Sequence, residues 1–197
     1  MSTIEAPPRV TAEEFLSLAE LGNYELVHGE VKAECVSVQS SWTGNRMSAR
    51  FDAFAETSGR GFAFGADILL RIWPNDPNHV RRPDAAYIRA ERLPGGRLPE
   101  TGYLEIAPDL VAEAVSPHDE AEEVERKVRE YLAAGVGLVW VAYPVTRTVH
   151  VYRANGTAEV LDDTGTLDGE DLLPGLRIAV SAIFPRQATA ATTATGP

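Results

Sequence analysis

An acidic residue stands inside one of the most apolar stretches of the sequence and limits how the chain can fold. Glu113 lies in PDLVAEAVSP, residues 108–117, between alanine and valine side chains. The run from Leu110 to Val115 is typical of a central strand that is buried on both faces. An ionised carboxylate is costly to bury unless it is paired, hydrogen-bonded or bound to a cation. The fold must therefore supply a partner for Glu113.

A second acid shows the same oddity. Asp84 follows a proline in RRPDAAYIRAERL, residues 81–93, and precedes an apolar run that predicts a strand over 84–89. Neighbouring strands could bring Asp84 and Glu113 to one point. Mg²⁺ prefers oxygen ligands and is commonly held by one or two carboxylates. Such a site can activate a water and neutralise a phosphodiester transition state. The two acids are therefore candidate metal ligands.

A cationic group for this site is sought on the segment that follows. DEAEEVERKVREYLAAG, residues 119–135, has acids in its first turn and a glycine at its end, which favours a helix. Lys127 lies about 60° from Val124 and about 40° from Tyr131 around this helix, at the margin of the packing face. Its ammonium could reach the strand-borne acids and orient an attacking water.

The remaining patterns predict the fold class. A capping box at Thr11 and Glu14 begins a short helix, and a hairpin turns at His28-Gly29. The later patterns predict a helix over 43–57, a long strand over 62–72, a strand in LVWVAY and a type I′ hairpin at Asn155-Gly156. We expect a mixed sheet with helices packed on it, α/β or α+β.

Length and composition limit the organisation of the chain. A chain of 197 residues is long enough for one compact domain, which we place at 11–185. We expect a flexible N-terminus over 1–10 and a disordered Ala/Thr-rich tail over 186–197. No run approaches the roughly 20 apolar residues of a membrane span, and residues 1–10 do not show the basic region followed by an apolar stretch that is typical of a signal peptide. We therefore expect a cytoplasmic protein without membrane contact.

Charge and cysteine content exclude other classes. The net charge of −11 opposes nonspecific coating of nucleic acid. Residues 46–97 nevertheless hold nine Lys/Arg against six Asp/Glu, so the sequence is compatible with a basic face on an acidic protein. Cys35 stands alone, which excludes an intrachain disulfide and a thiolate zinc cluster, and we expect it in the core. His28, His79 and His150 show no metal-ligand spacing.

Several of these segments together resemble one family. TAEEFLSL, YELVHGE, PDAAYI, PDLVAEAVSPHDEAEEVERKVREYLAAGV, VYRANG and LLPGLRI are similar to the Uma-two family, over about residues 10–185. That family is described as putative restriction endonucleases of the PD-(D/E)xK nuclease superfamily, formerly a domain of unknown function. The resemblance implies a restriction-endonuclease-like fold, a mixed sheet flanked by helices, with a divalent-metal site.

The resemblance also assigns residues. It makes Asp84 the first motif acid and Glu113 the second, with Glu25 of YELVHGE as an additional acid from the N-terminal region. The superfamily lysine normally follows the second acid by two positions, where this chain has Val115, and Lys127 on the next helix takes its place. His28 replaces a usual acid, and the histidine common before the helix over 43–57 is missing.

The sequence thus favours a Mg²⁺- or Mn²⁺-dependent DNA endonuclease with weak, salt-dependent DNA binding, and a homodimer is expected for double-strand cleavage. A noncatalytic nucleic-acid- or protein-binding module that retains the fold is the main alternative. A two-carboxylate glycosidase is chemically conceivable, although few aromatic residues accompany the acids. A structural interpretation also stands for each residue: Asp84 as a turn acid, Glu113 as a salt-bridged core acid, Lys127 as a snorkelling surface lysine and Glu25 as a solvated strand acid.

Overall fold

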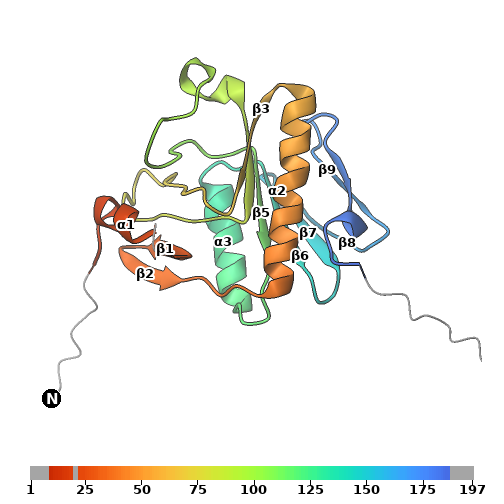
Figure 1. Cartoon of the computed structure of the whole chain (residues 1–197), viewed down its shortest axis with the longest axis horizontal. Helices are drawn as coiled ribbons and strands as arrows, with labels where there is room; N and C mark the ends of the chain where they lie inside the picture. Colours follow the sequence, from red (N-terminus) through yellow and green to blue (C-terminus); the bar gives the residue numbers. More distant parts are fainter. Residues whose placement is uncertain (1–8, 20–21, 187–197) are drawn as a thin grey trace, which may run out of the picture.

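A six-stranded mixed sheet forms the centre of the structure, a computed structural model that describes residues 9–19 and 22–186 (Figure 1). The strand order is β3-β4-β5-β6-β7-β8, in which β5 and β6 pair in parallel and the other neighbours pair antiparallel. The bounds are β3 Gly61–Gly65, β4 Ala85–Arg89, β5 Leu110–Ala114, β6 Leu138–Tyr143, β7 Thr148–Arg153 and β8 Ala158–Leu161. Most of segment 1–10 and nearly all of tail 186–197 lie outside the described residues.

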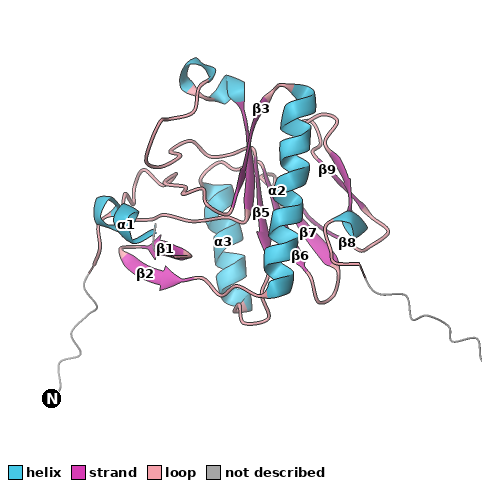
Figure 2. Cartoon of the chain, in the orientation of Figure 1, coloured by secondary structure: helices cyan, strands magenta, loops and turns pink. Residues whose placement is uncertain are grey.

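Two helices cover opposite faces of this sheet (Figure 2). Helix α2 (Val38–Ser58) packs Met47 and Phe51 against alternate strand residues such as Trp140. Helix α3 (Ala121–Ala133) packs Val128 and Tyr131 against the intervening strand residues. Because successive side chains of a strand point to opposite faces, each helix buries its own set. The predicted mixed sheet flanked by helices is confirmed.

The N-terminal elements dock beside this sheet as a separate small unit. Helix α1 (Ala12–Ala19) begins with the predicted capping box, in which the Glu14 side chain accepts from the Thr11 N–H at 2.9 Å. Strands β1 (Tyr24–Val27) and β2 (Glu30–Ala33) form the predicted hairpin. Its turn has positive φ at both His28 and Gly29, as a type I′ turn requires.

The remaining elements lie towards the C-terminus and around the loops. Strands β9 and β10 pair antiparallel in a small sheet of their own. Three short 3₁₀ helices complete the described elements. The bounds are β9 Thr166–Asp168, β10 Arg177–Ala179, η1 Ala90–Arg92, η2 Pro94–Gly96 and η3 Val180–Ala182. Among the described residues, no helix combines the length and the apolar character that a bilayer crossing requires.

The long strand predicted over 62–72 is wrong. Strand β3 ends at Gly65, and a turn follows in which the Ile68 N–H donates to the Gly65 carbonyl at 3.2 Å. Leu70 continues the apolar alternation, but it is buried through isolated bridges to Arg81 and Leu104 rather than in the main sheet. The alternation of apolar and polar residues indicates which side chains are buried, but it does not show whether the chain is straight. A chain that bends after Gly65 can bury the same apolar side chains without forming one long strand.

Three smaller expectations are also corrected. The helix predicted over 43–57 begins earlier, at Val38, because the Ser37 side chain caps it. Cys35 is exposed rather than buried in the core. The hairpin at Asn155-Gly156 exists, but Gly156 alone of this pair has positive φ, so the turn is not type I′.

A continuous strand over 62–72 would allow Asp67 to pair with Arg71 on one strand face, but Arg71 is engaged elsewhere. Arg71 pairs with Glu13 on α1 and with Glu105. The pairing with Asp67 assumed one continuous strand across both residues, and β3 ends before either of them. The bend in the chain therefore explains this difference as well.

Candidate active site

The acid before β4 is held rigidly at the edge of a pocket. The register that pairs Ala85 with Ala112 continues to bring Asp84 opposite Glu113. Asp84 Oδ2 accepts a hydrogen bond from the Ala114 N–H at 2.7 Å. Helix α2 passes so closely that a Cβ on Gly44 would lie 2.9 Å from both Cβ and Oδ1 of Asp84. Burial raises the pKa of Asp84 to about 6, against the lowering effect of the Ala114 hydrogen bond.

The acid on β5 points towards α3. Glu113 Oε1 accepts a hydrogen bond from the Tyr131 hydroxyl at 2.8 Å, and Oε2 lies 3.6 Å from Lys127 Nζ. Burial raises the pKa of Glu113 to about 8, although the Lys127 charge opposes the shift, and nearby Asp84 raises it further. The polar partner that the apolar strand lacked therefore comes from the helix between β5 and β6.

Lys127 is the cation at the centre of the carboxylates. Its Nζ lies 3.0 Å from Glu25 Oε1 and donates to Glu34 Oε1 at 2.9 Å. Burial would lower the pKa of Lys127, but the carboxylates of Glu113, Glu25 and Glu34 raise it well above its usual value. The ammonium is therefore protonated at neutral pH, as its proposed role needs.

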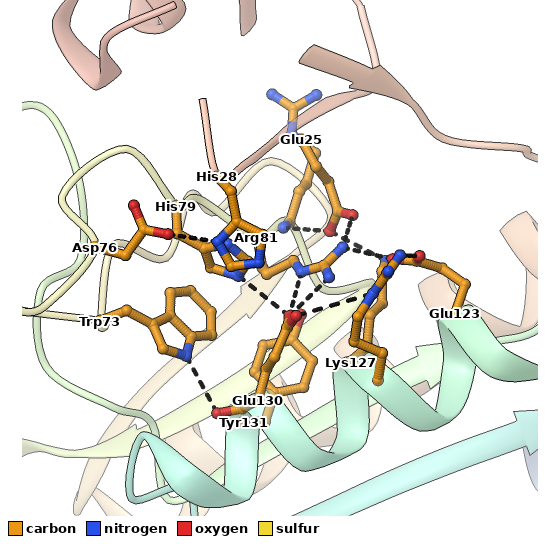
Figure 3. Close-up of polar contacts among 12 residues, drawn as sticks. Glu25, His28, Trp73, Asp76, His79, Arg81, Glu123, Lys127, Glu130 and Tyr131 are labelled. Carbon is orange, nitrogen blue, oxygen red and sulfur yellow. Dashed lines mark hydrogen bonds and ion pairs between the residues drawn. The ribbon is translucent and has the colours of Figure 1, made fainter. Parts of the chain in front are cut away.

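Glu25 comes from β1 and is the most firmly bound acid (Figure 3). Arg81 donates to its Oε2 at 2.7 Å, and the Arg82 N–H donates to its Oε1 at 3.0 Å. Burial would raise the pKa of Glu25, but Lys127 and Arg81 lower it. Glu34 lacks the arginine, and burial raises its pKa to about 7. One lysine therefore does not neutralise all the acids around it.

These residues line one pocket of about 360 Å³. All four residues predicted for the site contribute to it. Its carboxylates outnumber its ammonium groups: the acids are Glu25, Glu34, Asp84, Glu113, Asp119, Glu120 and Glu123, and the lysines are Lys32 and Lys127. A pocket with this excess of partly desolvated oxygen ligands attracts a hard cation.

Sequence reasoning missed some of the residues that complete this arrangement. Glu34 directly follows β2, and no sequence signal distinguishes it from the other acids of the hairpin segment. Tyr131 was placed on the packing face of α3, which is correct, but its hydroxyl contact with Glu113 depends on the register between helix and strand. Arg81 belongs to the basic residues of 46–97 that left a basic face open, but its side chain is fully buried.

The fold is similar to that of a solved structure. The crystal structure of a putative nuclease belonging to DUF820 from Anabaena variabilis ATCC 29413 matches with a TM-score of 0.72 at 21% sequence identity. The match covers 88% of this chain and 97% of that chain. It establishes an α+β nuclease fold with a mixed sheet, as the resemblance in the sequence implied.

The family follows from the sequence itself. Residues 12–181 match the model of the Uma2 family, described as a putative restriction endonuclease. The match spans most of the chain, so the protein belongs to the Uma2 family, and the predicted resemblance is confirmed. No curated protein matches it. Family and fold together support a nuclease.

Proposed function

We propose that this protein is a Mg²⁺-dependent endonuclease that hydrolyses phosphodiester bonds in DNA. Asp84 and Glu113 would hold the ion, Lys127 would position the attacking water, and Glu25 would assist at the metal. The observation that carries the proposal is the meeting of these four side chains in one pocket, although they come from β1, the start of β4, β5 and α3.

The pocket fits a hard divalent cation. Its acids offer oxygen ligands, and burial raises the pKa values of Asp84 and Glu113 by more than the nearby Lys127 charge lowers them. Mg²⁺ retains several waters and needs few protein ligands, and Mn²⁺ suits the same oxygen donors. When bound, the ion would supply an activated water and charge neutralisation at the phosphate.

The side chains around this position have distinct tasks. Lys127 carries a fixed positive charge that can stabilise the charge developing on a phosphodiester. Tyr131 holds one oxygen of Glu113, which leaves the other facing Lys127. The Ala114 N–H orients Asp84 in the same way. Glu25, fixed by Arg81 and Arg82, anchors the ammonium.

The charge distribution supports weak binding to DNA. Of the nine arginines in 46–97, Arg81 and Arg82 are buried in the structure. Seven arginines remain against the six acidic residues of the same segment. The segment therefore does not provide the strong basic surface that a tight, nonspecific DNA complex needs. We infer a low affinity that falls steeply with salt.

A binding module is the second candidate, and one observation favours it. Lys127 is engaged by Glu25 and Glu34, so its ammonium is compensated before any substrate arrives. A protein that had lost catalysis could keep this cluster as a structural ion network. The accessory histidine absent from SSWTGNR, residues 40–46 in the first turns of α2, agrees with such a loss.

Cleavage of supercoiled plasmid and single-stranded DNA at low salt with millimolar Mg²⁺ or Mn²⁺ tests the proposal. We expect slow nicking that EDTA and Asp84→Asn abolish. His150→Gln, on β7 outside the pocket residues, is the matched control and should nick like the parent. Nicking that persists in Asp84→Asn would reveal a contaminant, and no cleavage with either metal would favour the binding module.

The role of Lys127 has its own test. Lys127→Met should reduce cleavage by about 10²–10³-fold, whereas Mg²⁺ should still raise the melting temperature of the variant. Unchanged cleavage would make Lys127 a structural residue. Sedimentation with and without DNA measures whether two copies assemble, as double-strand cleavage would need.

A further inference from the structure

A second group of potential metal ligands lies apart from the acidic pocket. His28, Asp76 and His79 each offer one ligand atom, and these atoms all lie within 4.8 Å of one another (Figure 3). None of the three residues lines the pocket. The sequence did not predict this group, because His28 is far from the other two residues along the chain and ligand spacing within one segment cannot reveal such a contact.

The backbone brings the two segments together independently of these side chains. Leu26 on β1 and Val80 exchange two backbone hydrogen bonds, of 2.9 and 2.7 Å. The Gly29 N–H donates to the Asn78 carbonyl at 2.9 Å. His28, in the hairpin turn, is thus fixed beside the loop that carries Asp76 and His79. A ligand cluster on such a framework needs little reorganisation to bind an ion.

His79 is oriented as metal-binding histidines are. Its side chain is buried, and Nε2 lies 3.1 Å from Glu130 Oε2, a carboxylate that also accepts from Arg81 at 2.8 Å. Because that carboxylate accepts, Nε2 carries the proton. Nδ1 then bears the lone pair, and it has no hydrogen-bond partner among the described residues. A carboxylate that holds the far nitrogen is the usual outer partner of a metal-binding histidine.

The other two groups complete an open site. His28 Nδ1 lies 2.5 Å from Asp76 Oδ2, and both side chains reach solvent. The rings of His28 and His79 are 4.7 Å apart between centroids. Ligands of a tetrahedral zinc ion stand about 3.4 Å apart, since each bond is about 2.0–2.1 Å. The three ligand atoms, which lie within 4.8 Å of one another, would therefore have to approach by at most about 1.4 Å to reach this spacing.

We propose that His28, Asp76 and His79 bind a divalent transition-metal ion of the Zn²⁺ class, with solvent at the remaining position. Two imidazoles and one carboxylate suit Zn²⁺ and its neighbours Co²⁺ and Ni²⁺, whereas Mg²⁺ prefers oxygen ligands alone. The chain therefore carries two cation sites of different chemistry. The ion would join the β1–β2 turn to the loop before β4, and this site does not depend on the proposed nuclease activity.

Metal binding to the tag-free protein, stripped with EDTA and dialysed, tests the site. With millimolar Mg²⁺ present to occupy the acidic pocket, calorimetric titration with Zn²⁺ should show one ion bound per chain, and Co²⁺ should give the visible absorption of a low-symmetry, nitrogen-containing site. Zn²⁺ at about a hundredfold its dissociation constant should raise the melting temperature by about 5–10 °C. Mg²⁺ should not compete.

Variants decide where the ion binds. His28→Ala and Asp76→Asn change solvent-accessible side chains, so both should fold, and each should weaken Zn²⁺ binding at least tenfold. His150→Gln and Asp84→Asn should bind like the parent. The proposal would be overturned if the parent bound no Zn²⁺. It would also be overturned if His28→Ala and Asp76→Asn both bound Zn²⁺ as tightly as the parent. Loss in Asp84→Asn alone would place the ion in the acidic pocket and also overturn it.

Discussion

Replacement of Glu113 by glutamine should stabilise the metal-free protein, and this stabilisation should grow as the pH rises from about 5 to about 8. Burial raises the pKa of Glu113 from 4.5 to about 8, so the folded chain holds this proton more tightly than the unfolded chain does. The free energy of unfolding therefore falls as pH rises from about 4.5 to about 8. Below that interval the carboxyl is protonated in both states and costs nothing.

The size of the effect follows from the pKa. A rise from 4.5 to about 8 corresponds to about 5 kcal/mol at most, because one pKa unit is about 1.4 kcal/mol. Neighbouring carboxyls adjust their own protonation, so we expect about 2 kcal/mol to remain. Glutamine is uncharged and can still accept from Tyr131. Glu113→Gln should thus melt about 4–8 °C higher than the parent at pH 8.5 and at nearly the same temperature at pH 5.

Thermal unfolding followed by circular dichroism at pH 5, 7 and 8.5 measures this difference, with EDTA throughout. Glu122→Gln, on the exposed face of α3, is the matched control and should show no such pH dependence. Added Mg²⁺ should stabilise the parent but not Glu113→Gln. If Glu113→Gln melts lower than the parent at pH 8.5, the negative charge supports the fold, and the metal-ligand interpretation is wrong.

Two further substitutions test how the pocket is built. Gly44→Ala would place a methyl group 2.9 Å from Asp84, so the free energy of unfolding in urea should fall by about 1–3 kcal/mol and Mg²⁺ should stabilise the variant less. Asn45→Ala on the same helix is the control, and equal stability of the two variants would refute the close contact. Arg81→Met leaves three carboxylates without their shared guanidinium and should cost about 3–5 kcal/mol; a loss no larger than that of exposed Arg97→Ala would show that Arg81 contributes little.

The fold was predictable where local signals agree. Three local patterns each predicted a feature that exists in the structure. They are the apolar run around Glu113, which forms β5, the acids and glycine at the ends of the next helix, α3, and the Asn155-Gly156 turn between β7 and β8. The strand over 62–72 failed because alternation records burial without showing where the chain bends. The start of α2 was missed because a Ser37 cap gives no apolar signal.

The candidate site was predictable to a similar extent. Asp84 and Glu113 are conspicuous as acids beside apolar residues, and the helical angle of Lys127 placed it near them. Glu34 and the His28 cluster could not be found in this way, because their neighbours come from segments distant in sequence. Such contacts depend on how the N-terminal hairpin docks, which no local pattern determines.

The docking of that hairpin has a consequence for the working temperature of the protein. Strand β2 is exposed along its whole length and pairs only with β1 among the described strands. Strand β1 is held by the Leu26–Val80 bridge and by the contacts of Glu25 with Arg81 and Lys127, outside the main sheet. Segments with exposed backbone that lie outside the central sheet open before a protein unfolds globally. Opening here would withdraw Glu25 while the main sheet stays intact. Activity should therefore decline on heating before global melting, and amide exchange should be faster in the hairpin than in the central strands.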